Sequence, residues 1–516
     1  MIILLSDMAV SLVPSVLVDD ASRAADQLAF VRLHTKRVQL DVCDGSFVFR
    51  RSLADFSKLD FSGLEVEYHL MVSNPVDWLE RLPAPASVIC HVELSAPKVE
   101  AFLAGCQKRG IFPALGINPE TPVCRLAPYL SRVNRVTVLG VHPGWQDQEF
   151  LPFVLSKVRA LSKSNQNLQI QLDGGMQLSP SDEASSLFQA VQAGASSVIL
   201  GSALWKASSR EDVLSRAAKL AATAENARLS QSPPLTEFEK RIFLKSYQLR
   251  SDVIAMVTRA HSGHIGGALG LAEVFAVLFE RMHLDPKNPR DPGRDRLLVS
   301  NGHIGAIWYA SLARAGFFGI EELSSFRQLD SRLQGHPHNS SLPGIENSGG
   351  PLAQGLSQAV GRCLALRLSR SPARVYCIIG DGEINEGQAW EAFLSAAKFR
   401  LNQLTFLLDR NGIQIDDYSE NVLPLEPLAD KLRAFNIHPI EIDAHDPNEI
   451  VRALDEAAAF DLGPSVIVCH STPGKGVSFF EGDFKWHGTP PSIEQAMAAK
   501  MELDNALQRI GRGQSP

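Results

Sequence analysis

The chain has 516 residues, which is too long for a single hydrophobic core and predicts two to four domains. Its net charge of −7 gives no electrostatic case for binding nucleic acid or an anionic membrane, and no apolar run is long enough to cross a bilayer. The seven cysteines are odd in number and form no CxxC pair, so we expect a reducing, cytoplasmic location.

The first part of the chain, up to about residue 222, alternates short β-rich runs with helical stretches. The start lacks the basic and apolar regions of a signal peptide, and either Met1 or Met8 can be the first residue. Alternation of this kind predicts a parallel (β/α)8 TIM barrel over residues 8–222. The expected strands are 37–42, 63–71, 86–94, 112–117, 135–141, 168–175 and 196–203, and helical patterns cover 75–82, 98–110 and 152–164.

The second part begins after a stretch rich in serine and proline, which predicts a linker over residues 223–237. Beyond it, longer helical patterns alternate with the buried strands 374–380, 403–409 and 464–470. This alternation of helices and buried strands predicts a doubly wound α/β domain over residues 238–503. We expect residues 504–516 to form a frayed tail.

Four polar residues of the first part are expected at the carboxyl-terminal mouth of the barrel. Gln39 and Asp41 share one face of a strand because side chains alternate with period two, and His69 and Asp173 end later strands. Two carboxylates and an imidazole suggest a metal together with one acid and one base, as needed to invert a carbon beside a carbonyl. The segments 173–175 and 200–204 follow the last two strands, where barrels commonly cradle a phosphate.

The motifs "DVCDGSFV", "YHLM", "VHPGWQDQEF" and "ILGSAL" resemble those of ribulose-phosphate 3-epimerase, in order, over about residues 8–206. The resemblance implies that Asp41 and Asp173 are the acid/base pair and that both, with His69, bind a Zn²⁺- or Fe²⁺-like ion. It also implies a set of substrate contacts: Ser15, Gly144, Gly174, Gly175, Gly201 and Ser202.

One residue departs from the epimerase pattern. Gln39 stands where the family has a metal-binding histidine, and a glutamine oxygen is a weaker ligand than imidazole. We therefore expect the barrel to be either a slow epimerase that needs added metal or a sugar-phosphate binding module.

In the second part, a buried strand ends in the turn Gly380-Asp381-Gly382, where the backbone can approach a ligand closely. Asn411 follows Asp381 by 30 residues, about the length of a helix and a strand, so both are expected at the carboxyl ends of adjacent parallel strands. Carboxylate, carboxamide and carbonyl oxygens suit Mg²⁺ or Ca²⁺ bridging a diphosphate.

The stretch "GDGEINEGQ…LLDRNGIQI" resembles the thiamine diphosphate motif of the transketolase family, and the resemblance extends over about residues 238–503. It implies that Asp381, Asn411 and the carbonyl of Ile413 bind the metal. Cofactor contacts are implied for Gly350, Leu352, Gly382, Glu386 and Asn411. Four histidines are implied to line the funnel above the cofactor and to handle the protons of the sugar: His264, His303, His336 and His487.

The family also needs a pyrimidine-binding domain whose glutamate activates the cofactor, and the sequence ends before one begins. We therefore expect the N-terminal part of a split transketolase that forms a higher oligomer and needs a separate C-terminal partner subunit. The expected function is a pentose-phosphate-type fusion of epimerase and transketolase, acting on sugar phosphates. Open alternatives are an inactive barrel, an unusual sugar substrate, a deoxyxylulose-phosphate synthase and an α-keto acid dehydrogenase component, although the histidines weigh against the last.

Overall fold

The computed structural model describes residues 10–83, 85–144, 148–164, 168–178, 185–229 and 234–516. The chain divides into two compact units, Met1–Ser232 and Pro233–Pro516. The structure shows six cysteines that are free and buried: Cys43, Cys90, Cys106, Cys363, Cys377 and Cys469. No helix in the described ranges combines the length and the apolar character needed to cross a membrane.

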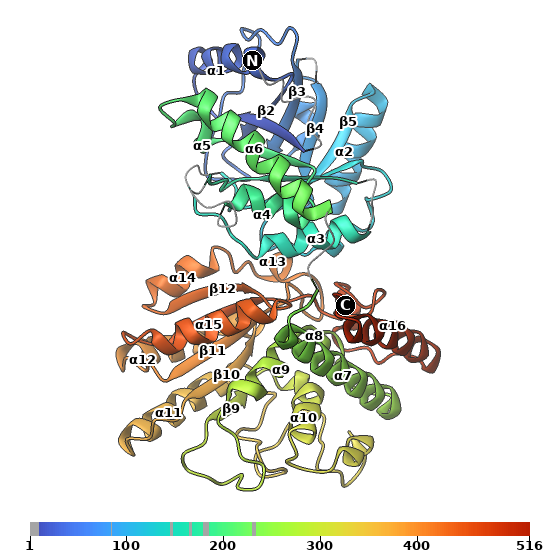
Figure 1. The fold of residues 1–516 in the computed structure, drawn as a ribbon, viewed down its shortest axis with the longest axis vertical. Helices are drawn as coiled ribbons and strands as arrows, with labels where there is room; N and C mark the ends of the chain where they lie inside the picture. Colours follow the sequence, from blue (N-terminus) through green and yellow to red (C-terminus); the bar gives the residue numbers. More distant parts are fainter. Residues whose placement is uncertain (1–9, 84, 145–147, 165–167, 179–184, 230–233) are drawn as a thin grey trace. The chain divides into compact units, whose positions relative to one another are not determined.

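Eight parallel strands close into a barrel in the first unit, which confirms the predicted TIM barrel (Figure 1). β1 closes the ring by pairing with both β2 and β8. β8 reads Ser-Val-Ile-Leu and is buried at every position, as expected for a parallel strand covered on both faces. The strands are β1 Ser11–Val16, β2 Arg37–Cys43, β3 Glu65–Met71, β4 Pro85–His91, β5 Phe112–Ile117, β6 Arg135–Leu139, β7 Gln169–Asp173 and β8 Ser197–Leu200.

The helices of the barrel follow from local signals in the sequence. The Asp20 side chain accepts a hydrogen bond from the Arg23 N–H and starts α1, and Gly110 ends α2 in the left-handed conformation. The helix expected over 75–82 is only the 3₁₀ turn Pro75–Trp78. The helices are α1 Ala21–His34, α2 Ala96–Arg109, α3 Val154–Ser164, α4 Ser186–Ala193, α5 Ser202–Trp205 and α6 Arg210–Leu229.

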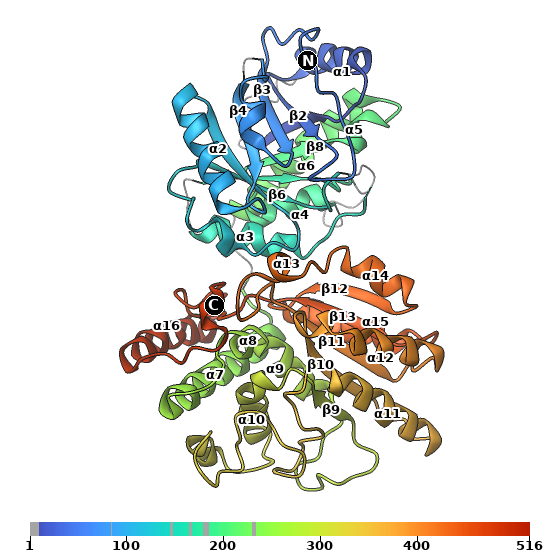
Figure 2. The ribbon, with the colours of Figure 1, turned by 180° about the vertical axis from the view of Figure 1, so that it is seen from behind.

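A five-stranded parallel sheet forms the centre of the second unit, and Figure 2 shows its strands following one another from β12 to β9. The spatial order is β12, β13, β11, β10, β9. Residues of β10 alternate between two cores: Tyr376 and Ile378 pack on one side, and Cys377 and Ile379 on the other. The sheet therefore carries helices on both faces, which confirms the expected doubly wound fold. Its strands are β9 Arg296–Val299, β10 Val375–Gly380, β11 Leu404–Arg410, β12 His438–Asp443 and β13 Ser465–His470.

The helices of this unit divide between the two faces. Residues of α7, α9, α10, α15 and α16 belong to one core, and residues of α11, α12 and α14 belong to the other. The helices are α7 Glu237–Ala260, α8 Gly266–Gly270, α9 Ala272–Arg281, α10 Gly305–Arg314, α11 Gln354–Leu368, α12 Gly387–Lys398, α13 Ser419–Val422, α14 Leu428–Ala434, α15 Pro447–Ala459 and α16 Ile493–Gly511.

The structure corrects two expected boundaries. Residues 223–229 of the expected linker belong to α6, because Ala-Glu-Asn-Ala-Arg is a strong helical sequence and Arg228 pairs with Glu225. The expected tail is helical up to Gly511, because Ala506 and Ile510 continue the buried face of α16. A capping box between Thr236 and Glu239 begins α7.

Candidate active sites

A pocket opens at the mouth of the barrel, and every residue expected to contact substrate there lines it. Asp41 lies on β2, His69 on β3 and Asp173 at the end of β7. Closure of the barrel therefore brings together side chains that are far apart in the sequence. The expected substrate contacts in the pocket wall are Ser15, Gly144, Gly174, Gly175, Gly201 and Ser202.

The two aspartates and His69 form one polar cluster. His69 Nδ1 lies 3.3 Å from Asp41 Oδ1 and 3.3 Å from Asp173 Oδ2. Burial raises the pKa of Asp41 and outweighs the opposing hydrogen bond from His69, and the charge of Asp173 adds to the rise. Burial opposes a charge on His69, but its hydrogen bonds to Asp173 and Asp41 outweigh burial and raise its pKa to about 9.

The divalent metal implied by the epimerase resemblance would have to bind at this polar cluster. Ligand atoms of Asp41, His69 and Asp173 lie within 4.8 Å of one another, close enough to share an ion. However, Gln39 Nε2 lies 2.8 Å from Asp41 Oδ1 and 2.7 Å from Asp173 Oδ2. The expectation that Gln39 offers an oxygen is wrong: its amide nitrogen donates to the oxygens that an ion would need. The residues present do not fit the implied metal.

Two residues at the end of β4 belong to this site and were missed in the sequence. His91 Nε2 lies 2.9 Å from His69 Nε2, and His91 Nδ1 lies 3.1 Å from Glu93 Oε2. Glu93 is anchored in turn by the Asn118 N–H at 2.8 Å. The signal was present as "HVE", a histidine and a carboxylate two residues apart where an apolar strand ends.

Glycines shape the end of the pocket where a phosphate is expected. Gly174 and Gly175 have φ of +99° and +71°, which favours glycine. A Cβ on Gly174 would meet Val141 at 2.4 Å, and one on Gly175 would meet the Phe150 backbone at 2.7 Å. These close approaches leave backbone at the pocket surface where side chains would otherwise stand.

In the second unit, β10 and β11 are adjacent and parallel, and Gly380 is paired in register with Asp409. Asp381 and Asn411 follow the two strands directly. Asp381 Oδ2 accepts the Gly412 N–H at 2.8 Å, so the aspartate lies against the backbone beside Asn411. Asn411 Oδ1 accepts the Ile413 N–H at 3.0 Å. The oxygen-bearing residues expected to bind a metal therefore gather at one edge of the sheet.

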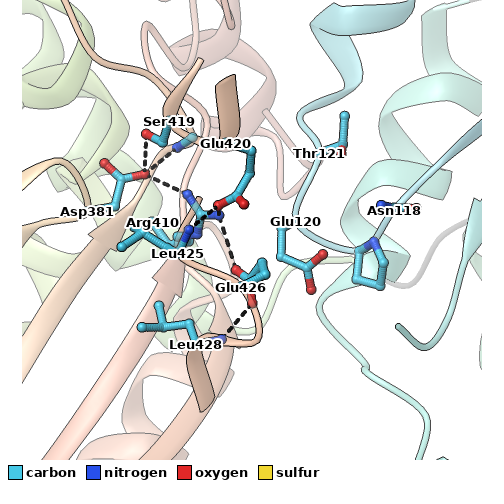
Figure 3. A network of polar contacts seen from close by, with 12 residues as sticks. Asn118, Glu120, Thr121, Asp381, Arg410, Ser419, Glu420, Leu425, Glu426 and Leu428 are labelled. Carbon is cyan, nitrogen blue, oxygen red and sulfur yellow. Dashed lines mark hydrogen bonds and ion pairs between the residues drawn. The ribbon is translucent and has the colours of Figure 1, made fainter. Parts of the chain in front are cut away.

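Arg410 holds Asp381 in place and was not anticipated from the sequence. Figure 3 shows Arg410 between Asp381, Glu420 and Glu426. The guanidinium is 2.9 Å from Asp381, 2.6 Å from Glu420 and 3.1 Å from Glu426. Ser419 adds a hydrogen bond of 3.1 Å to the same aspartate oxygen. Burial opposes the charge of Arg410, but Glu426, Asp381 and Glu420 outweigh it and raise its pKa.

The four expected histidines come together in one cluster. Ring centroids of His264 lie 5.5 Å from His303, 5.8 Å from His336 and 5.6 Å from His487, and His303 and His487 are 4.8 Å apart. Burial, followed by the neighbouring His487, lowers the pKa of His264 to about 4. Burial also lowers the pKa of the other three, so all four rings are neutral at pH 7.

Several buried polar atoms around this cluster have no hydrogen-bond partner among the residues that the structure describes. They include His264 Nδ1, His303 Nε2 and both polar side-chain atoms of Asn301. Buried polar groups are normally satisfied, so these atoms fit a site that receives a polar ligand. Gly302 and Gly349 also approach so closely that a Cβ on either would meet the other's backbone below 3.0 Å. The residues present therefore fit thiamine diphosphate with a hard cation.

The remaining expected cofactor contacts lie in two segments, one just before α11 and one just after β10. Gly350 has φ of +119° and lies against His336, and Leu352 and Glu386 are exposed. Gly382 packs against Gln414. Glu383 was not anticipated from the sequence. Its carboxylate accepts the Ala353 N–H at 2.7 Å, the Gly380 N–H at 3.1 Å and the Ser300 hydroxyl.

Comparisons with known proteins agree with this division of the chain. The family model described as "Transketolase, thiamine diphosphate binding domain" matches residues 245–506, about half of the chain. The chain belongs to the transketolase family. The model of the "Ribulose-phosphate 3 epimerase family" matches residues 11–205, ahead of the transketolase region.

Relatives of the transketolase region include proteins named as subunits. It is 44% identical over 243 residues to the "6-deoxy-6-sulfo-D-fructose transketolase subunit SqwG" of Clostridium sp. (strain MSTE9), covering 47% of this chain and 88% of that relative. It is 33% identical over 268 residues to a protein of Phocaeicola vulgatus that is named as one of the subunits of apulose-4-phosphate transketolase. This match covers 52% of this chain and 95% of that relative. Transketolase from Campylobacter jejuni is a similar solved structure, with 34% identity and a TM-score of 0.49; the match covers 51% of this chain and 43% of that chain.

Proposed function

We propose that the second unit binds thiamine diphosphate with Mg²⁺ or Ca²⁺ and transfers a two-carbon ketol unit between sugar phosphates. The observation that carries this proposal is the cluster of four histidines, with unpartnered nitrogens on His264 and His303 among the described residues. Asp381, Asn411 and the carbonyl of Ile413 would hold the cation at the ends of β10 and β11. Glu386, Gly350, Leu352 and Gly382 would contact the cofactor.

When bound, thiamine diphosphate supplies the nucleophilic carbon that takes up the two-carbon unit. The chain itself positions the sugar and moves protons. Neutral imidazoles can accept a proton from a sugar hydroxyl and return it, because each ring carries one donor and one acceptor nitrogen. The pKa of His264, lowered to about 4, keeps this ring neutral over the physiological range. The other hydroxyl groups of the sugar would contact His303, His336 and His487.

A separate pyrimidine-binding subunit belongs to the proposal. Two relatives named as transketolase subunits are matched over 88% and 95% of their length, whereas Escherichia coli Transketolase 2 is matched over only 39%. We propose that this chain, like those subunits, works with a partner that supplies the rest of the site, within a higher oligomer.

Co-purification with the product of a neighbouring reading frame tests the two-subunit proposal. The purified chain should show no ketol transfer by itself, and adding the C-terminal subunit should restore turnover. Robust transfer by this chain alone would contradict the proposal. The readout is formation of an aldose phosphate from xylulose 5-phosphate.

The barrel is proposed to interconvert ribulose 5-phosphate and xylulose 5-phosphate at C3. Asp41 and Asp173 face each other across His69 and would remove and return the proton from opposite sides. Backbone at Gly174, Gly175 and Gly201 would hold the phosphate. The product of this site would be the ketol donor of the second unit. If the barrel is instead a binding module, both carboxylates serve only to hold the sugar.

A second candidate concerns the sugar. The relative named for 6-deoxy-6-sulfo-D-fructose shares 44% identity, more than the 33% of the relative named for apulose 4-phosphate. A sulfonated ketose is therefore a candidate donor. Parallel assays of the assembled complex with xylulose 5-phosphate, fructose 6-phosphate and 6-deoxy-6-sulfofructose decide between the donors by their kcat/KM.

A further inference from the structure

The side chain of Gln39 lies at the centre of a buried chain of amide groups inside the barrel. Gln39 and Gln171 are fully buried, and Glu67 is 3% exposed. Gln39 donates both hydrogens of Nε2, one to Asp41 and one to Asp173. Its Oε1 accepts from Gln171 Nε2 at 2.9 Å. Every polar atom of the Gln39 side chain thus has a partner.

The direction of the Gln39 amide is set by its neighbours. Gln171 Nε2 also donates to Glu67 Oε1 at 2.7 Å, and a carboxylate can only accept. Ser197 donates to Gln171 Oε1 at 3.2 Å, and Arg135 pairs with Glu67 on the far side. Gln171 therefore must present N–H to Gln39. If the Gln39 amide were reversed, its N–H groups would face the N–H of Gln171. Its carbonyl oxygen would then face the carboxylates of Asp41 and Asp173.

A divalent cation and this amide would compete for the same two oxygens. Asp41 Oδ1 and Asp173 Oδ2 each accept from Gln39 Nε2, and His69 Nδ1 approaches the same pair at 3.3 Å. An ion shared by Asp41, His69 and Asp173 would face the hydrogens of Nε2. Binding it would require Gln39 to turn, so the buried N–H of Gln171 would lose its acceptor at 2.9 Å and keep only the Thr137 hydroxyl, at 3.4 Å.

We propose that the Gln39 amide takes the place of the divalent cation in this barrel. Two N–H donors hold the carboxylate pair together, and the chain Glu67–Gln171–Gln39 fixes their direction. The barrel site then holds no metal. The inference deepens the proposed function of the same site, and metal binding tests it separately from turnover.

The experiment titrates Co²⁺ into the full-length, metal-stripped chain and records the visible absorption of bound Co²⁺ together with calorimetry. Binding is assigned to the barrel when Asp173→Asn abolishes it, which separates it from the second unit. Wild type should show no such binding at micromolar Co²⁺. Gln39→His supplies an imidazole and should bind one Co²⁺ at least about 100-fold more tightly than wild type.

A second variant keeps the test decisive if Gln39→His does not fold. Gln171→Met removes the donor that directs Gln39, so the amide can turn its oxygen to an ion, and Co²⁺ affinity should rise about tenfold. Gln107→Met is the matched control, because Gln107 is exposed on α2 and does not line the pocket, and this variant should behave as wild type. Affinity unchanged in Gln171→Met would contradict the role of the amide chain.

Proton exchange at C3 of ribulose 5-phosphate, measured with a chelator present, separates the inference from the proposed function. Exchange that persists without metal supports both. Absence of Co²⁺ binding together with absence of exchange supports the inference and contradicts the epimerase. Tight wild-type Co²⁺ binding that is lost in Asp173→Asn overturns the inference whatever the exchange rate.

Discussion

Asp381 and Arg410 are paired in the interior of the second unit, with Asp381 Oδ2 2.9 Å from Arg410 Nη1 and both side chains at most 2% exposed. The aspartate expected to bind the metal is thus held by a buried cation. The same guanidinium reaches Glu420 on α13 and Glu426 before α14. One side chain therefore connects the proposed metal site with the segment that follows β11.

Replacing this cation should destabilise the second unit. Arg410→Met leaves Asp381 buried without its charged partner, which typically costs about 3–5 kcal/mol. Urea unfolding measures the loss. Arg433→Met is the control, because Arg433 pairs with Asp430 at an exposed site and should change the free energy of unfolding by less than about 0.5 kcal/mol. Equal stability of Arg410→Met and wild type would show that the buried pair contributes little.

Removing the Asp381 carboxylate should abolish cation-dependent binding of thiamine diphosphate in the assembled complex. The diphosphate charge would lose the ion that neutralises it, and we expect affinity to fall by more than about 100-fold. Calorimetric titration with and without Mg²⁺ checks this in Asp381→Ala. Asp430→Ala, at an exposed position, should bind as wild type does. If Asp381→Ala bound thiamine diphosphate as tightly as wild type, the Gly-Asp-Gly segment would be only a turn and not part of the cation site.

The histidine cluster should make the chain less stable in acid. His264 has a pKa of about 4 in the folded chain, against an ordinary value of 6.5. Between these pH values the unfolded chain binds more protons, so stability falls as pH drops, by up to about 1.4 kcal/mol per pH unit for each such histidine.

Urea unfolding without cofactor at pH 7.5, 6.0 and 5.0 measures this slope. His264→Gln should lose one histidine's share of it and become less sensitive to acid. The exposed His338 provides the control, since His338→Gln should keep the wild-type slope. A slope that His264→Gln leaves unchanged would argue against a neutral buried ring at this position.

The barrel carboxylates should control proton exchange at C3. Asp173→Asn removes one of the two proton-transfer groups, and we expect exchange to slow by about 100- to 10,000-fold. Loss of the C3 proton signal of ribulose 5-phosphate in heavy water reports the rate. Asp26→Asn, at an exposed helix position, should match wild type. If proton exchange at C3 were equally slow in wild type and Asp173→Asn, we would conclude that the barrel only binds the sugar phosphate.

Much of the fold was predictable because parallel strands leave strong local patterns. β10 and β11 are mostly apolar and buried at every position, and Asp381 and Asn411 follow them directly, so both could be placed at one sheet edge from their spacing. The C-terminal ends of α6 and α16 were missed. The residues beyond Ala222 and Leu503 are mostly alanine or polar, so they resemble a linker or a tail until the packing of the helix face is known.

The direction of a buried side chain could not be predicted in the same way. Gln39, Gln171 and Glu67 lie on three different strands, and only their meeting inside the barrel decides which end of the Gln39 amide faces the carboxylates. Arg410 looked like an ordinary residue beside Asn411, because its partners Glu420 and Glu426 lie in segments with no motif. Local sequence carries no record of such contacts.

The proposed role of the Gln39 amide would make the barrel independent of the supply of metal ions. An amide is part of the polypeptide, so it arrives with folding and cannot be stripped by a chelator or exchanged for a competing ion. Transition-metal sites select poorly by affinity alone, and their occupancy follows supply. A carboxylate pair bridged by Gln39 would keep the same composition when zinc or iron is scarce, leaving the cation of the thiamine diphosphate site as the inorganic requirement of the two proposed activities.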